Sequence, residues 1–520
     1  MFPVAAALMC ALLSQAPSAR SAQDVQAWLH EAWEQFQKQQ WERSRQAALK
    51  ALEMNPRLGD AEIILGLVAT AQNEFEEAEK RFRNATALQP ANPRAHAYLG
   101  STYLQLKRAG DAARAFQEVL RLDPANLSAT YNLGLISLVE GKPAEALPRF
   151  ERVHRAEPKD VPALIGVLEC QLLLRRSQEA AASAGKLVTL VDVCDPRLLQ
   201  SATMLAMHGE YASAIPILER IRRAAPESRD ASYNLALAYL RSSQPDKAAG
   251  VVQALLGGPG AAEAYNLLAE VESARKRQRE ALAAYRRAAE LEPGNGDYRF
   301  DYAAALVEVE GAAAGAAEFA GGVRDFPGSW RMRLGSGSAA YLEGRYEEAV
   351  RALLEAVRLQ PSAREAYYLL GHAYESAQSL HPEVAKAFEA YLSRKPDDPW
   401  ALYHYGTILY LRSQSEGEKT YALARAYLLK AVSLKPDFAE AYVQLGMIAE
   451  KDEEAVKHLE RAVELSPGLA SAHYRLGLAL QRLGDRERAR QEMDLFRKLR
   501  AENEAAERAR VLDSLSRQKK

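Results

Sequence analysis

Residues 65–90 read LGLVATAQNEFEEAEKRFRNATALQP, residues 99–124 read LGSTYLQLKRAGDAARAFQEVLRLDP, and residues 133–158 read LGLISLVEGKPAEALPRFERVHRAEP. Each stretch begins 34 residues after the one before it. All three hold Leu-Gly at the start, Ala and Phe at the same places inside, and Pro at the end. A period of this length, with two helical patterns in each copy, indicates a helix-turn-helix unit that stacks on its neighbours.

Each repeated residue type has a physical reason at its place. Gly66 and Ala78 fall where the two helices of one unit cross, and only a small side chain lets the backbones approach there. A larger residue would overpack the crossing. Leu65 and Phe82 supply apolar bulk between successive helix pairs, and Pro90 stops the second helix. The pattern therefore predicts a chain of packed helix pairs.

The residue types and their spacing resemble the tetratricopeptide repeat (TPR) family. Measured between closing prolines, the period runs from Pro56 to Pro361 in steps of 33 or 34 residues, with one double step, and then becomes irregular. This spacing predicts about fourteen units, which cover most of the chain. The resemblance implies an all-α fold, a right-handed superhelical solenoid of antiparallel helix pairs.

Three stretches break the period. Ser177 to Pro196 carries a poor second-helix pattern, Gly311 to Ser338 has glycine where alanine is expected, and Ser413 to Thr420 holds six extra residues. The glycine-rich stretch has low helix propensity and is a candidate hinge. The predicted organisation is a signal peptide at 1–22, an N-terminal TPR arm at 23–310, a glycine-rich irregular repeat at 311–338, a C-terminal TPR arm at 339–490, and a charged capping helix and tail at 491–520.

The chain begins with an apolar run from Val4 to Leu13, which is the length of a signal-peptide core and too short to span a bilayer. Small residues follow up to Ala22, where a signal peptidase cut is expected. We therefore expect an exported protein, periplasmic or secreted, with no integral membrane segment after signal removal. A disordered apolar start of a cytoplasmic protein is the alternative.

Charge and cysteine content narrow the partners and the chemistry. The 67 basic and 68 acidic residues nearly cancel, so we expect no nucleic-acid partner. The three cysteines form no CxxC pair and have no histidine partner, which gives no support for a zinc or redox site. Cys170 and Cys194 either form a disulfide in an oxidising compartment or remain two ordinary thiols.

Sequence motifs of catalysis are missing from the chain. It holds no GxSxG, GxxxxGK[ST] or HExxH, and its nine histidines are scattered. We therefore expect a protein that is not an enzyme and uses no cofactor or metal.

The resemblance implies that the first helix of each unit lines a concave groove, with its exposed positions one turn to either side of the Leu-Gly pair. Aromatic residues gather at these positions in the irregular C-terminal arm, and aromatics suit a peptide-binding surface. The alternative is that they merely pack against the adjacent unit. The candidate partner-binding residues are Tyr368, His372, Trp400, Tyr403 and Tyr410.

After Asp485 the chain continues as one charged helical pattern. Its first half is expected to cap the open apolar end of the array. From about Asn503 onward the pattern favours a solvated helix over a coiled-coil strand, although Val511, Leu512 and Leu515 form a short apolar stripe.

The leading functional hypothesis is a non-enzymatic scaffold that binds extended peptides or partner proteins in a concave TPR groove. The alternative is an accessory or regulatory subunit of an enzyme complex in envelope assembly or polysaccharide handling. The sequence does not identify the partner.

Overall fold

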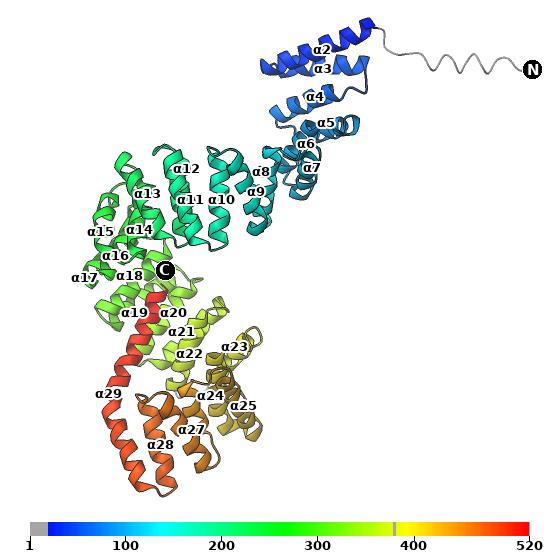
Figure 1. The fold of residues 1–520 in the computed structure, drawn as a ribbon. Helices are drawn as coiled ribbons and strands as arrows, with labels where there is room; N and C mark the ends of the chain where they lie inside the picture. The colour runs from blue at the N-terminus through cyan, green and yellow to red at the C-terminus, as the bar shows by residue number, and fades with distance from the viewer. Residues whose placement is uncertain (1–18, 378–380, 519–520) are drawn as a thin grey trace, which may run out of the picture. The chain divides into compact units, whose positions relative to one another are not determined.

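The computed structural model describes residues 19–377 and 381–518. Within these residues every regular element is a helix (Figure 1). Most of the expected signal peptide, residues 1–18, lies outside the described residues, and the first described helix begins at Ala19. No described helix combines the length and the apolar character that a membrane span needs.

The chain divides into two compact units, which we call the N-terminal unit (up to Ala238) and the C-terminal unit (from Tyr239). The N-terminal unit contains the following helices, the last of which crosses the division: α2 (Ala19–Gln37), α3 (Trp41–Met54), α4 (Gly59–Ala71), α5 (Phe75–Leu88), α6 (Pro93–Gln105), α7 (Ala109–Leu122), α8 (Leu127–Val139), α9 (Pro143–Ala156), α10 (Val161–Leu173), α11 (Ser177–Leu190), α12 (Pro196–Met207), α13 (Tyr211–Ala224) and α14 (Arg229–Arg241).

The C-terminal unit continues the same alternation of first and second helices. Its elements are α15 (Pro245–Val252) with the 3₁₀ turn η1 (Gln253–Leu255), α16 (Ala261–Ala274), α17 (Gln278–Leu291), α18 (Gly296–Val309), α19 (Ala312–Asp325), α20 (Trp330–Leu342), α21 (Tyr346–Leu359), α22 (Arg364–Ala377), α23 (Pro382–Leu392), α24 (Pro399–Glu416), α25 (Glu418–Leu434), α26 (Ala439–Met447), α27 (Asp452–Leu465), α28 (Ala470–Arg482) and α29 (Arg486–Arg517). The described residues thus form fourteen helix pairs, from α2–α3 to α28–α29. This confirms the all-α repeat fold and the predicted number of repeats.

Local sequence explains why each pair forms. Many first helices begin after a capping side chain: Asn92, Asn126 and Asp160 each accept a hydrogen bond from a backbone amide in the first turn that follows. The turn inside most described pairs contains a residue with positive φ, such as Asn73 at 60° or Gly141 at 72°. This left-handed residue ends the first helix and lets the second run back along it.

The crossing of the two helices explains the Leu-Gly signature. A Cβ atom added to Gly66 would lie 2.5 Å from the Phe82 ring, and one added to Gly100 would lie 2.9 Å from the Phe116 ring. Both phenylalanines are almost fully buried. The glycine therefore makes room for the phenylalanine of the second helix, whereas the sequence pattern assigned this phenylalanine to the space between successive helix pairs.

Two of the irregular stretches form regular helices. The poor second-helix pattern after Ser177 nevertheless forms a complete helix, α11, and Pro196 opens α12 behind the capping side chain of Asp195. The extra residues near Ser413 lengthen both helices of one pair, to 18 residues in α24 and 17 in α25, instead of forming a loop. Gly417, with φ at 87°, separates the two helices.

The glycine-rich stretch 311–338 lies inside the C-terminal unit, in α19 and α20. Several of its glycines are places of close contact: a Cβ on Gly322 would lie 2.6 Å from the Met332 sulfur, and one on Gly335 would lie 2.2 Å from the Phe319 ring. Close packing explains why glycine replaces alanine here. Motion at this stretch stays a prediction.

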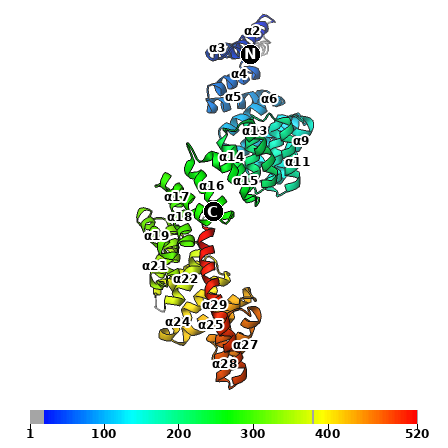
Figure 2. The same cartoon turned by 90° about the vertical axis from the view of Figure 1, so that its left-hand side faces the viewer.

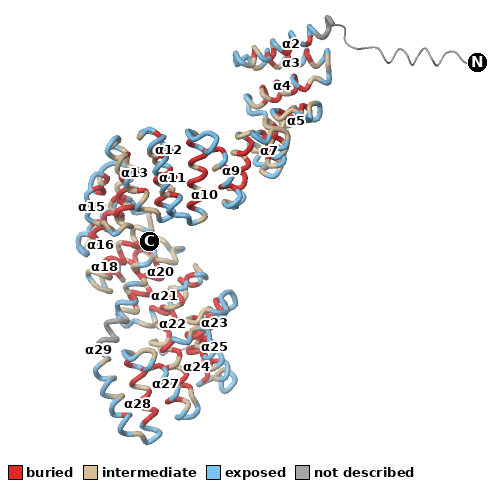
Figure 3. The backbone as a smooth tube through the Cα atoms, viewed as in Figure 1, coloured by how far each residue is buried: buried red, intermediate tan, exposed pale blue. Residues whose placement is uncertain are grey.

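The expectation of a solvated tail is wrong for the end of the C-terminal helix α29. Its first part packs on α28, where the Tyr474 and Phe496 rings lie 5.0 Å apart, and this contact agrees with the predicted capping role. The helix then runs back within the C-terminal unit, and its end lies against α18 and α20 (Figures 1 and 2). Val511 and Leu515 are buried there, whereas much of the helix before them is exposed (Figure 3).

Candidate functional site

Two cavities lie beside α29 on one face of the C-terminal unit. The face is formed by the first helices α18, α20, α22 and α24, which we call the first-helix face. The end of α29 that contacts this face, residues 508–518, is called the tail segment. Each cavity has a volume of about 320 Å³ and is bounded both by first helices and by the tail segment.

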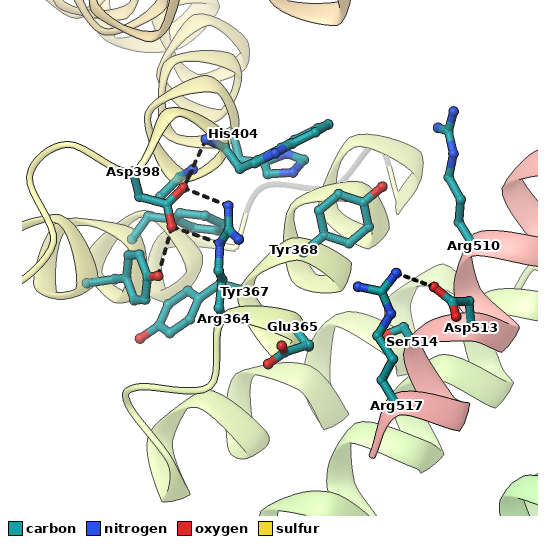
Figure 4. A pocket seen from close by; sticks show the side chains of 14 residues that line it. Arg364, Glu365, Tyr367, Tyr368, Asp398, His404, Arg510, Asp513, Ser514 and Arg517 are labelled. Atoms are coloured by element: carbon teal, nitrogen blue, oxygen red, sulfur yellow. Dashed lines mark hydrogen bonds and ion pairs between the residues drawn. The ribbon is translucent and has the colours of Figure 1, made fainter. Parts of the chain in front are cut away.

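The first cavity is drawn in Figure 4. Its aromatic wall includes Tyr368 of α22 and Trp400 of α24, whose rings lie 5.4 Å apart and nearly perpendicular. The opposite wall is the tail segment, from which Arg510 and Arg517 contribute basic side chains. Glu365 of α22 adds an acidic group to the same cavity. The site therefore combines aromatic surface with charges of both signs.

Asp398 holds this aromatic wall in place. Its side chain caps α24 by accepting a hydrogen bond of 3.1 Å from the Trp400 backbone amide. The same carboxylate accepts hydrogen bonds from the Tyr391 hydroxyl at 3.0 Å and from the Arg364 guanidinium at 3.1 Å (Figure 4). A caged carboxylate of this kind fixes the start of α24 and thereby the position of Trp400.

The second cavity lies on the other side of the same aromatic pair. Tyr368, Trp400 and Arg510 line both cavities, while His372 and Val511 line only the second. The tail segment therefore touches the first-helix face without filling the space on either side of it.

A buried polar cluster lies behind the aromatic wall. His404 of α24 is 1% exposed, and its Nδ1 lies 2.9 Å from the Glu375 carboxylate. Its ring centroid is 4.8 Å from that of His372, and the Nε2 atoms of both histidines are buried without a hydrogen-bond partner. Gly371 makes this arrangement possible, because a Cβ there would lie 2.3 Å from the His404 ring.

The cluster changes the protonation of its members. Burial, together with the nearby His404 and Arg510, lowers the pKa of His372 to about 4. Burial alone would raise the pKa of Glu375, but the hydrogen bond with His404 and the electrostatic interaction with the two histidines outweigh it, so this pKa is lowered. At neutral pH the cluster thus contains a neutral His372 beside an ionised Glu375.

The tail segment is anchored by apolar side chains on two helical turns. Leu515 is fully buried in one cluster with Phe300, Phe319 and Met332, and Val511 is 3% exposed in the neighbouring cluster of the C-terminal unit. Burying an aliphatic side chain of this size stabilises a contact by about 1.5–3 kcal/mol. The apolar stripe seen in the sequence is therefore a docking surface.

Polar contacts add direction to this docking. The Ser516 hydroxyl donates a hydrogen bond to the Glu308 carboxylate of α18. Arg331 of α20 donates to the backbone carbonyl of Gln518 and also pairs with Asp301 at 3.4 Å. The Arg331 guanidinium lies 4.4 Å above the Phe300 ring, so it joins the apolar and polar halves of the contact.

The structure separates the five residues expected at the groove. Tyr368, His372 and Trp400 come together at the walls of the two cavities. Tyr403 is only 5% exposed and packs against Phe438 at 5.2 Å between ring centroids, so its side chain is not available on the surface. Tyr410 faces Tyr421 of the partner helix α25.

Sequence reasoning missed the residues that the tail segment brings to the site, above all Arg510 and Arg517. The stripe of Val511, Leu512 and Leu515 was a signal that the helix has a partner surface, but the surface itself lies about two hundred residues earlier in the chain. Asp398 was likewise missed, although an aspartate before Pro399 is a recognisable helix cap.

Neither metal nor disulfide chemistry is built into the described part of the chain. No group of three or more histidine, cysteine, aspartate or glutamate side chains there is arranged to hold a metal ion. Cys170 is buried and Cys194 is exposed, and both are free thiols. Of the two alternatives left open by the sequence, the structure therefore has two ordinary thiols and not a disulfide.

Comparison with solved structures finds many chains of similar fold and low sequence identity. PilF of Pseudomonas aeruginosa is 22% identical over 41% of this chain and 97% of its own, with a TM-score of 0.35. A chain of the APC/C hetero-tetramer Cut9-Hcn1 is 14% identical over 89% of this chain and 97% of its own, with a TM-score of 0.34. A chain of the Naa15/Naa10 complex bound to HypK-THB is 13% identical over 91% and 99%, with a TM-score of 0.32. No curated protein matches this chain.

Comparison with family models identifies the repeats directly. Models described as tetratricopeptide repeat match residues 65–127, 103–147, 205–261, 262–295 and 471–502. A further model, described as TPR repeat, matches residues 337–378 and 447–484. These matches fall in both units, and the match to residues 262–295 coincides with the helix pair α16–α17. The chain belongs to the tetratricopeptide repeat family.

Proposed function

We propose that this chain is a non-enzymatic scaffold that binds a partner protein on the first-helix face of its C-terminal unit. The observation that carries the proposal is the pair of cavities beside Tyr368 and Trp400. Membership of the repeat family supports the general role, because such arrays commonly serve as protein-interaction scaffolds.

The chemistry of the site suits a protein ligand. Tyr368 and Trp400 are partly exposed and are held by neighbouring rings, so a partner meets rigid aromatic surface and loses little conformational entropy on binding. The basic Arg510 and acidic Glu365 sit at the edge of this surface, where charges select the partner more than they strengthen the complex.

Affinity capture with matched variants tests the proposal. The full chain, immobilised, is exposed to extract of its native source beside the variants Trp400→Ala and Tyr368→Ala. Tyr131→Ala is the control, because Tyr131 is a half-buried tyrosine of a first helix in the N-terminal unit. We expect a protein that the wild type and the control retain and both variants lose.

Equal retention by all four chains would contradict the assignment of the face. The identity of the retained protein also decides between an ordinary protein partner and a large enzyme to which this chain would be an accessory subunit. Circular dichroism of each variant shows whether the helix content is intact.

We also propose that the protein is exported. The proposal rests on the apolar run from Val4 to Leu13 and the small residues up to Ala22. Sequencing the N-terminus of the protein from its native source tests it: a mature chain that begins just after Ala22 supports export, and a chain that retains Val4 contradicts it.

A further inference from the structure

The tail segment shows what shape of ligand the first-helix face accepts. It lies on the face as a helix, with Val511, Leu512 and Leu515 on one side. The spacing of these residues, i, i+1 and i+4, is that of an amphipathic helix that buries one stripe. Arg510, Asp513 and Arg517 lie on its exposed side.

The receiving surface is built for such a helix. Leu515 is buried in a cluster with Phe300, Phe319 and Met332. These residues form an apolar pocket that takes one aliphatic side chain. At the end of the helix, Arg331 binds the carbonyl of Gln518, one of the backbone oxygens that a helix leaves without an internal partner. The face therefore recognises both an apolar stripe and a helix C-terminus.

The contact of the tail segment leaves part of the face unused. Only two of its side chains, Val511 and Leu515, are buried among the described residues 508–518. The cavities on either side remain open, and Tyr368 and Trp400 form the wall between them. The covalent chain keeps the tail segment close, which gives even a small contact a high effective concentration.

We propose that the first-helix face binds an amphipathic helix of a partner protein, and that the tail segment occupies this face until such a helix displaces it. The partner helix carries aliphatic residues spaced like Val511 and Leu515 and reaches further than the tail segment, into the cavities at Tyr368 and Trp400. This inference rests on the proposed function, and it replaces an extended peptide with a helix as the form of the ligand.

A synthetic peptide of residues 508–518 with a fluorescent label is the probe. Its binding is measured by fluorescence anisotropy to the full chain, to Leu515→Asp and to Val511→Asp, in which the native tail segment loses its apolar anchor. Leu495→Asp is the matched control, because Leu495 is an exposed leucine of the same helix.

We expect the peptide to bind Leu515→Asp and Val511→Asp at least tenfold more tightly than it binds the wild type, because the face is then free. Leu495→Asp should bind it like the wild type. A second peptide, with aspartate at the position of Leu515, should bind the released chains at least tenfold more weakly than the native peptide. This second comparison uses the same protein for both peptides, so it does not depend on how well a variant folds.

Equal affinity for all four chains, or equal affinity of the two peptides, would overturn the inference. Its failure is distinguishable from failure of the proposed function. A captured protein that depends on Trp400 but binds Leu515→Asp no better than the wild type overturns displacement and leaves the proposed function standing. The expected peptide results without any Trp400-dependent partner support occupation of the face by the tail segment and contradict the proposed function.

Discussion

Two regions can be compared: the regular repeats α4 to α9, and the first helices α18 to α24 of the C-terminal unit. In both, a glycine at the helix crossing accommodates a large apolar side chain, but the two regions differ in the side chains that their surfaces expose. Gly66 makes room for Phe82 in the first region, and Gly337 makes room for Leu353 in the second. In the second region the first helices also carry Tyr368 and Trp400, and the chain's own end covers part of their face. Crossing residues therefore build the array, and under the proposed function the residues between crossings select the partner.

The largest expected effect is a loss of stability when a buried phenylalanine at a helix crossing is removed in either region. Phe116→Ala and Phe319→Ala should each lower the free energy of unfolding by about 3–5 kcal/mol, because both rings are buried at a helix crossing. Only Phe319 also contacts Leu515, so only Phe319→Ala should speed hydrogen exchange in residues 508–518. Urea denaturation and hydrogen exchange with mass spectrometry measure the two effects. An unchanged tail segment in Phe319→Ala would show that the two regions do not differ in this way.

The next effect concerns the docking of the tail segment alone. Leu515→Ala removes a fully buried side chain and should weaken docking by about 2–4 kcal/mol. The change is read from the exchange rates of amides in residues 508–518. Leu495→Ala, on the exposed side of the same helix, should change these rates by less than about 0.5 kcal/mol in equivalent free energy. Similar results for both leucines would mean that the tail segment does not dock through its apolar stripe.

One pH-dependent effect is expected from His372 in the second region. The pKa of His372 is about 4 in the folded chain, below the usual value of about 6.5 in an unfolded one. The unfolded state therefore binds more protons between these values, and the free energy of unfolding falls as the pH drops from 6.5 toward 4. We expect a loss of about 1–3 kcal/mol, since each pKa unit corresponds to about 1.4 kcal/mol and His372 borders a cavity.

His372→Gln isolates this effect, because it removes the titrating group. Denaturant midpoints measured from pH 7 to pH 4 should fall less steeply in His372→Gln than in the wild type. His208→Gln, at an exposed histidine of the N-terminal unit, should follow the wild type. The contribution of Glu375, whose pKa is lowered in part by His372, is lost at lower pH and is unchanged only in the wild type and His208→Gln. Parallel curves for all three would refute the assignment to His372.

The smallest effect compares two thiols of the N-terminal unit. Burial raises the pKa of Cys170 to about 12, so its reactive thiolate is scarce, whereas Cys194 is exposed. Iodoacetamide at pH 8, followed by peptide mapping, should label Cys194 more than tenfold faster than Cys170. Labelling of Cys170 should rise to the rate of Cys194 in denaturant, and comparable rates in the folded chain would contradict the packing of α10.

The period of the sequence predicted the helix pairs because each pair is a local structure. Gly66, Phe82 and Pro90 lie within one repeat, and their spacing indicates the two helices and the turn that ends them, although the contact of Gly66 with Phe82 emerged only from the structure. The candidate site could be predicted only in part. Their position on first helices, beside the Leu-Gly position of the repeat, identified Tyr368 and Trp400, which line the cavities. The same criterion also selected Tyr403, whose ring is covered by Phe438 of the next repeat.

The tail segment could not be placed from the sequence for a different physical reason. Its apolar stripe at Val511 and Leu515 was visible, yet the surface that buries it comes from α18 and α20. A long-range contact of this kind leaves no periodic signal, because it joins two segments that belong to different repeats. The role of Arg331 could not be predicted for the same reason. Its partners include Asp301 nearby and the carbonyl of Gln518, far away in the sequence.

Hydrogen exchange of residues 508–518 in the unmodified full chain tests the central claim most directly. If the tail segment occupies the first-helix face, its amides should exchange many times more slowly than those of an unstructured chain, and Leu515→Asp should remove this protection. Rapid exchange in the wild type, or protection that survives Leu515→Asp, would show that the tail segment does not dock on the face.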